Sequence, residues 1–107
     1  MESVKHLVRV EPSICIPRVS STISKETILS VFNRFELGQI SCIDTVQRNA
    51  DTEFNAGYQK VFIHFHKWND NPVATQIRNR LLSGKEVKII YDSPWFWKLS
   101  ANKSKKN

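Results

Sequence analysis

The segment Gly57–His66, with the sequence GYQKVFIHFH, decides the fold of this chain. Its residues alternate between two chemical classes, and such an alternation places the two classes on opposite faces of a β-strand. The first class is apolar and should face a core: Val61, Ile63 and Phe65. The second class joins a cation, an aromatic ring and an imidazole: Lys60, Phe62 and His64. The sequence therefore predicts a strand that packs on one face and binds a ligand on the other.

The second face of this strand has the chemistry of a nucleic-acid surface. An aromatic ring can stack on a nucleobase while neighbouring cations hold the phosphate groups. Aromatic residues are also common in strands for packing reasons alone. The alternative is therefore that a C-terminal segment covers Phe62, and the two interpretations differ in whether this ring is accessible.

Length and charge indicate one small domain with an acidic partner. The chain has 107 residues, which suits a single compact domain. Its net charge is +6 and its pI is about 9.6, a balance that favours nucleic acid, an anionic membrane surface or an acidic protein. Four lysines and no acids lie between Lys98 and Asn107, so the rest of the chain carries only +2. We expect residues 98–107 to form a disordered basic tail.

Cysteine content indicates a reducing compartment, and hydropathy indicates that the chain does not span a membrane. Cys15 and Cys42 are too few for a disulfide framework, and the sequence contains no Cys-x-x-Cys spacing. No apolar run approaches the roughly 20 residues of a membrane span, and the N-terminus lacks the apolar block of a signal peptide. We therefore expect an intracellular protein, in the cytoplasm or nucleus, with no membrane span.

Two helices and three further strands are predicted around the central strand. Ser24 is a suitable N-cap for a helix over Lys25–Phe35, and Pro72 opens a second helix that ends at Ser83 and Gly84. The other strands are expected at residues 13–19, 40–48 and 87–91. The predicted core is formed by the apolar residues on the inner faces of these elements: Ile14, Ile16, Ile28, Val31, Phe32, Phe35, Val61, Ile63, Phe65, Ile77, Leu81, Val87 and Ile89.

The predicted order of elements is strand, helix, strand, strand, helix, strand, which is the split βαβ arrangement of the ferredoxin-like class. We predict an α+β sandwich, in which a four-stranded antiparallel sheet carries two helices on one face. The domain would span residues 13–97 and include a C-terminal aromatic segment. Residues 1–12 would form an N-terminal extension.

Within that class the chain resembles the RNA recognition motif (RRM) family over Ser13–Tyr91. Ile14–Val19 lies where the family has its first-strand hexamer, and Tyr58–Phe65 lies where it has its third-strand octamer. The family's three usual stacking positions fall at Cys15, Lys60 and Phe62. Only the last of them is aromatic here. The resemblance implies single-stranded nucleic acid, RNA or DNA with RNA favoured, bound on the sheet, and the departures imply weak, sequence-tolerant binding.

The predicted nucleic-acid surface combines the central strand with a basic rim. On the central strand its members are Tyr58, Lys60, Phe62 and His64. Arg18 and Arg48 are expected at the rim, and Lys88 should lie further along on the last strand. A base stacked on Phe62 would contribute about 1–3 kcal/mol. The lysines would hold phosphates and make the affinity fall with salt.

The segment DSPWFWK, residues 92–98, supports an alternative function. Three consecutive bulky aromatic residues, Trp95, Phe96 and Trp97, are costly to leave in water. Since tryptophan is enriched at interface hot spots, the three residues would anchor a protein partner or a homodimer. At least one tryptophan is instead expected to fold back into the core. The segment also resembles the ending of small uncharacterised proteins of large DNA viruses, which implies a viral structural or accessory protein in the infected-cell cytoplasm or the virion.

Catalysis and cofactor binding have little support in the sequence. No glycine-rich phosphate loop is present, and neither cysteine stands beside a histidine with an orienting acid. A metal site built from Cys15, His64 and His66 lacks a fourth ligand, so we expect no metal and no cofactor. We therefore predict a binding module that is not an enzyme.

Overall fold

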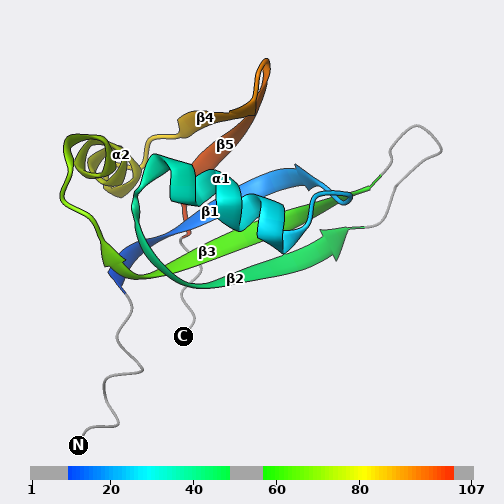
Figure 1. Cartoon of the computed structure of the whole chain (residues 1–107), viewed down its shortest axis with the longest axis horizontal. Helices are drawn as coiled ribbons and strands as arrows, with labels where there is room; N and C mark the ends of the chain where they lie inside the picture. The colour runs from blue at the N-terminus through cyan, green and yellow to red at the C-terminus, as the bar shows by residue number, and fades with distance from the viewer. Residues whose placement is uncertain (1–9, 49–56, 103–107) are drawn as a thin grey trace, which may run out of the picture.

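The computed structural model describes residues 10–48 and 57–102, which form one sheet and two helices (Figure 1). In chain order the elements are β1 (Val10–Ser20), α1 (Lys25–Phe35), β2 (Gly38–Arg48), β3 (Tyr58–Trp68), α2 (Pro72–Leu82), β4 (Val87–Asp92) and β5 (Trp95–Ala101). Most of the predicted N-terminal extension, the loop at 49–56 and residues 103–107 lie outside the described residues.

The prediction of an α+β protein with an antiparallel sheet and two helices is confirmed. The prediction of four strands is wrong, because the sheet formed by the described residues has five strands in the order β2-β3-β1-β5-β4. Each neighbouring pair of strands runs antiparallel. β5 occupies the position beside β1 that the four-stranded arrangement would give to the strand at residues 87–91. The latter strand, β4, is displaced to the edge of the sheet.

The additional strand arises from the aromatic segment and the residues after it. In β5 the side chains of Trp97 and Leu99 are buried, whereas those of Phe96 and Lys98 are exposed. Period-two burial of this kind is the signature of a strand, but the apolar run at residues 95–97 conceals it in the sequence. β5 pairs with β4 in a hairpin and with β1 through Ser100. Residues 98–101 therefore belong to the sheet and not to a basic tail.

Both helices begin at side-chain caps, and the cap of α1 at Ser24 and the start of α2 at Pro72 agree with the sequence predictions. The Ser24 hydroxyl accepts a hydrogen bond from the amide of Thr27 at 3.1 Å, and the Asn71 side chain accepts one from the amide of Ala74 at 2.8 Å. These bonds satisfy amides that have no partner within the first turn. The caps set where α1 and α2 start, and so which of their residues face the sheet.

The core lies between the two helices and one face of the sheet. The predicted members that are buried in it are Ile14, Ile16, Ile28, Val31, Phe32, Val61, Ile63, Phe65, Leu81 and Ile89. The other predicted members are half-buried against it: Phe35, Ile77 and Val87. Buried residues that the sequence analysis did not include are Val19, Leu37, Trp68, Ala74, Trp97 and Leu99. Within residues 10–48 and 57–102, both helices therefore pack on one face of the sheet, and the other face carries no helix.

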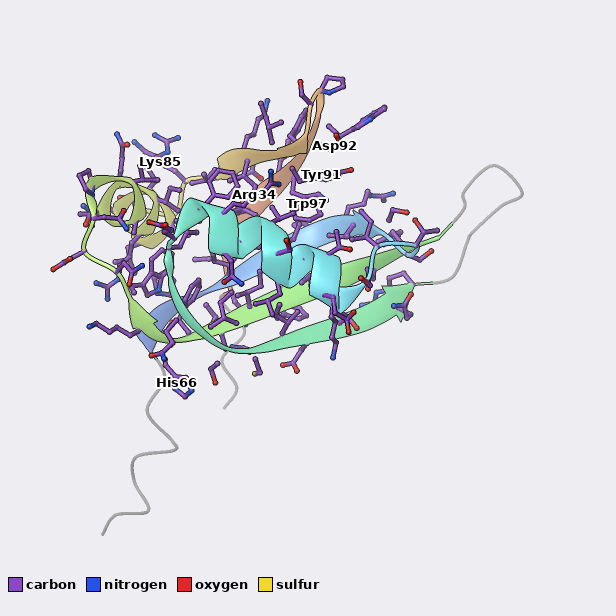
Figure 2. The ribbon with its side chains drawn as sticks, viewed as in Figure 1. Arg34, His66, Lys85, Tyr91, Asp92 and Trp97 are labelled. Carbon is purple, nitrogen blue, oxygen red and sulfur yellow. The ribbon has the colours of Figure 1, made fainter. Side chains whose placement is uncertain are left out.

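Trp97 joins the hairpin of β4 and β5 to this core. Its ring stacks on Tyr91 with 4.2 Å between ring centroids, and it lies parallel to Phe32 of α1 at 6.2 Å. The guanidinium of Arg34 donates a hydrogen bond to the carbonyl oxygen of Tyr91 at 3.2 Å. Figure 2 shows Arg34, Tyr91 and Trp97 in the space between α1 and the hairpin. The aromatic segment is thus part of the fold and not an appendage.

Candidate functional site

The candidate site is the sheet face that carries no helix among the described residues, and we call it the open face. Residues directly opposite each other on neighbouring antiparallel strands share a face, so the strand register identifies its members. On β2 and β3 they are Cys42, Asp44, Val46, Arg48, Tyr58, Lys60, Phe62 and His64. On the other strands they are Cys15, Lys88, Ile90, Phe96, Lys98 and Ser100. The open face therefore mixes rings, cations and potential metal ligands.

Phe62 lies at the centre of the open face and is half-buried. Its cross-strand partners are Cys15 of β1 and Asp44 of β2. β1 separates β3 from β5, so the segment at residues 95–97 does not lie across Phe62. The alternative in which this segment covers the Phe62 ring is therefore wrong, because the segment is itself part of a strand of the sheet.

Tyr58 lies beside both of the arginines that were predicted at the rim. The guanidinium carbon of Arg18 lies 4.2 Å from the centroid of the Tyr58 ring, which is a cation–π contact. Arg48 of β2 lies directly opposite Tyr58 in the register. The pairing of β1 with β3 is irregular between Ile16 and Val19, and Arg18 lies within this irregular stretch. One ring and two cations thus form a unit at this end of the open face.

Lys60 lies between this unit and Phe62 and is half-buried. Burial raises the pKa of the neighbouring Cys15 thiol, while the charge of Lys60 and a hydrogen bond with Ser100 act in the opposite direction. The predicted position of Lys60 beside Phe62 follows from the strand alternation.

Lys88 does not join the cluster on β3, because β5 and β1 stand between the two strands. Its ammonium lies 4.8 Å from the centroid of the Phe96 ring, and its cross-strand partner is Lys98. Like charges directly opposite each other repel. Lys88, Phe96 and Lys98 thus form a second unit of one ring and two cations. Of these three residues, the predicted nucleic-acid surface included only Lys88.

An open groove lies between the two ring-and-cation units. It runs alongside the part of β1 that extends past the residues paired with β5. Its lining residues are Pro17, Arg18, Phe96, Trp97 and Lys98. One wall carries Arg18, which contacts Tyr58, and the other carries Phe96, which contacts Lys88. The groove therefore offers a path between two ring-and-cation units on different halves of the sheet.

His64 differs from its predicted role as a surface residue. It is 6 % exposed, and its Nδ1 lies 2.9 Å from the Ser13 hydroxyl. Its Nε2 lies 3.1 Å from Oδ2 of Asp44. Since a carboxylate only accepts, the ring in its neutral form donates its Nε2 proton to Asp44 and accepts at Nδ1 from the Ser13 hydroxyl. The ring is held edge-on by neighbours and does not present a stacking surface to a base.

The sequence of contacts Ser13–His64–Asp44 has the residue types of a hydrolytic triad but not the accessibility. A nucleophilic serine must reach a substrate carbonyl, and Ser13 is only 5 % exposed. The carboxylate of Asp44, which in such triads is enclosed, has a side chain 63 % exposed. This contact chain therefore orients His64, and it does not support acyl transfer.

The three aromatic residues predicted as protein anchors separate into two groups. Trp97 is 3 % exposed and belongs to the core, so it is not available to a partner. Trp95 is 62 % exposed and Phe96 is 46 % exposed. The burial of one tryptophan was expected, and Trp97 is the buried one because Phe32 of α1 and Tyr91 lie against its ring.

Two sets of open-face residues were missed by the sequence analysis. Phe96 and Lys98 become recognisable once residues 95–101 are read as a strand with period-two burial. The pair Cys42 and Asp44 carries the signal of two potential ligands spaced i and i+2 on a β-branched strand. Only the register, which places Cys42 opposite His64, shows that these ligands converge.

Comparisons with known proteins do not assign a function, so the function is inferred from the geometry of the chain itself. No family model, curated protein or solved structure gives a significant match. In the part of the chain that the structure describes, no helix is both long enough and apolar enough to cross a lipid bilayer.

Proposed function

We propose that this chain is a non-catalytic module that binds single-stranded nucleic acid, with RNA favoured over DNA, on the open face of its sheet. The observation that carries the proposal is the pair of ring-and-cation units, Arg18 with Tyr58 and Lys88 with Phe96. Phe62 and Lys60 lie on the same face. Rings of this kind stack on bases, and the cations beside them neutralise phosphates.

The charge and exposure of the units suit a flexible, single-stranded ligand. Two adjacent lysines, Lys88 and Lys98, face the same side of the hairpin, and a bound phosphate would relieve their repulsion. The accessible rings are spread over β3 and β5, so successive bases could occupy separate positions. Such a surface discriminates poorly between sequences, because stacking is available to every base.

The proposal also includes a finer assignment of the fold, as ferredoxin-like and RRM-like. A ferredoxin-like, RRM-like origin is supported by β1 and β3 as central neighbours and by two helices packed on one face. In this interpretation β5 takes the position of the family's last strand, and β4 is an addition at the edge. The resemblance of the aromatic segment to proteins of large DNA viruses extends the proposal to a viral protein acting inside the infected cell or packaged in the virion.

The experiment that tests the proposal is fluorescence anisotropy with labelled single-stranded RNA and DNA at two salt concentrations. Phe62→Ala should weaken binding by about 5- to 150-fold, the equivalent of 1–3 kcal/mol for one stacked base, with little change in the salt slope. Leu82→Ala is the matched control, since Leu82 is an exposed apolar residue on α2 and away from the open face. It should bind like the parent.

Two outcomes would overturn the proposal. If Phe62→Ala binds like the parent and the affinity vanishes with salt, only nonspecific attraction to the basic chain remains. If the parent binds neither RNA nor DNA, the open face is not a nucleic-acid surface.

Protein association through the hairpin is the second candidate, and the exposure of Trp95 favours it. The expected form is a homodimer in which Trp95 and Phe96 pack against a second copy. Sedimentation velocity of the parent and Trp95→Ser would test this form, with a dimer that the substitution dissociates as the expected result. A monomeric parent over the accessible concentration range would exclude it.

A further inference from the structure

Three different metal-ligating side chains converge on the part of the open face furthest from β4. Cys42 and Asp44 are two residues apart on β2 and so point to the same side of the sheet. The register places Cys42 directly opposite His64 of β3. The sulfur of Cys42, a carboxylate oxygen of Asp44 and a ring nitrogen of His64 all lie within 4.8 Å of one another.

The donor set of this cluster selects a class of metal. A thiolate and an imidazole favour zinc and related borderline divalent ions, and a carboxylate is an accepted third ligand. A cluster of oxygen ligands alone would instead suit magnesium or calcium. Three protein ligands leave the fourth tetrahedral position open, which is the arrangement of zinc sites that keep a water molecule.

We propose that Cys42, Asp44 and His64 bind one zinc ion whose fourth ligand is water. This inference is independent of the proposed function, since it uses neither the rings nor the cations of the open face. It differs from the site considered from the sequence, because Cys15 is not among the converging ligands and His66 is exposed at the end of β3, where it projects away from the sheet (Figure 2).

Ser13 prepares His64 for this role. A metal-bound imidazole needs a partner for its other ring nitrogen, which fixes the ring's orientation and tautomer. The Ser13 hydroxyl lies 2.9 Å from Nδ1, and both groups are buried. A hydroxyl both donates and accepts, so Ser13 suits the metal-free ring as a donor and the metal-bound ring as an acceptor.

Zinc binding changes the protonation of His64 and Cys42. Without metal, the Nε2 proton of His64 bridges to Asp44 over 3.1 Å. Zinc takes that position, the ring proton moves to Nδ1, and Nδ1 then donates to Ser13. Cys42 binds as a thiolate and releases its proton to solvent, so one proton leaves per zinc bound.

The site would join the edge strand β2 to its neighbour β3. β2 forms one edge of the sheet and pairs only with β3 in the described order. A ligand that binds the folded state and not the unfolded state raises stability by mass action. Zinc should therefore raise the thermal midpoint of the full chain, and it should do so through Cys42.

The test is titration of the reduced, metal-free full chain with Co²⁺ as a spectroscopic probe, followed by displacement with Zn²⁺. We expect one ion per chain and a thiolate-to-cobalt absorption band. Cys42→Ser should abolish the band and the rise in thermal midpoint, whereas Cys15→Ser, the matched control, should keep both. Circular dichroism of each variant checks that it folds.

Two further variants separate ligation from general structure. Ser13→Ala should keep the band but weaken zinc by about 10- to 100-fold, the usual cost of losing an outer-shell partner of a ligating histidine. His66→Ala should bind like the parent. The proposal is overturned if the parent binds no Co²⁺ or Zn²⁺, or if Cys42→Ser retains the parent's band and affinity. RNA binding measured with a chelator present reports on the proposed function separately.

Discussion

The two faces of the sheet are built from the same strands but follow different rules. On the helix-covered face the side chains of Ile14, Ile63 and Leu99 are fully buried. On the open face their neighbours Cys15, Phe62 and Lys98 are half-buried or exposed. One face is specified by packing, and the other by pairwise contacts between rings, cations and polar groups.

β5 contributes side chains to both faces of the sheet. Trp97 and Leu99 belong to the core, while Phe96 and Lys98 belong to the open face. Adjacent residues therefore have unrelated roles, and residues two apart have related ones. Residue type alone does not separate Trp95 from Trp97, and the separation comes from which elements lie over each ring.

The largest expected effect is the contrast between Trp97→Ala and Trp95→Ala. Removing Trp97 leaves a cavity beside Phe32 and Tyr91, so the free energy of unfolding should fall by about 3–5 kcal/mol. Trp95 is an exposed residue, and its removal should change stability by no more than about 0.5 kcal/mol. Urea unfolding measures both values. Equal losses would mean that the hairpin packs differently.

A smaller effect is expected on the open face from Lys98→Glu. The change replaces repulsion with attraction opposite Lys88, so stability should rise by about 0.2–1 kcal/mol. The same change should weaken nucleic-acid binding and reduce its salt dependence, because a phosphate contact is lost.

Lys85→Glu is the control for this substitution. Lys85 is exposed in the turn after α2 and lies outside the cross-strand pairs of the hairpin. The same charge change there should give no comparable gain in stability. If both variants behave alike, net charge explains the effect, and the pairing of Lys88 with Lys98 does not.

The smallest perturbation is chemical labelling of the two cysteines. Burial raises the pKa of Cys15 above its ordinary value in the folded chain, despite the opposing effects of Lys60 and Ser100. Its thiolate should therefore form at higher pH than in the unfolded chain, and alkylation should accelerate over that higher range.

Cys42→Ser isolates this reaction at Cys15, and denatured chain provides the reference, with a chelator present throughout. Lys60→Ala should shift the profile further upward, because it removes the charge that favours the thiolate. A Cys15 profile that matches the denatured chain would show that the middle of the open face is more hydrated than this structure indicates.

Local signals in the sequence were sufficient for the elements that stand on strong alternation or caps. The inner residues of β3 follow from period two, and the start of α1 follows from Ser24. The same signals failed for β5, because Trp95, Phe96 and Trp97 are all apolar and hide the alternation. A hairpin after Tyr91 was for this reason interpreted as an aromatic segment with a tail.

The candidate site was predictable only where it depends on one strand. Lys60 and Phe62 share a face of β3 by alternation alone. The pairing of Arg18 with Tyr58 needs the irregular register of β1, which no local pattern reports. The exposure expected for His64 was wrong, because Ser13 and Asp44 approach it from other strands.

The two helices, the two-sided central strand and most of the core could be predicted from the sequence, because these features depend on spacing within one segment. Three other features became visible only in the folded chain: β5 enters beside β1, Trp97 is buried while Trp95 is exposed, and Cys42 meets His64. These features depend on strand order and register, which arise from packing between segments far apart in the chain.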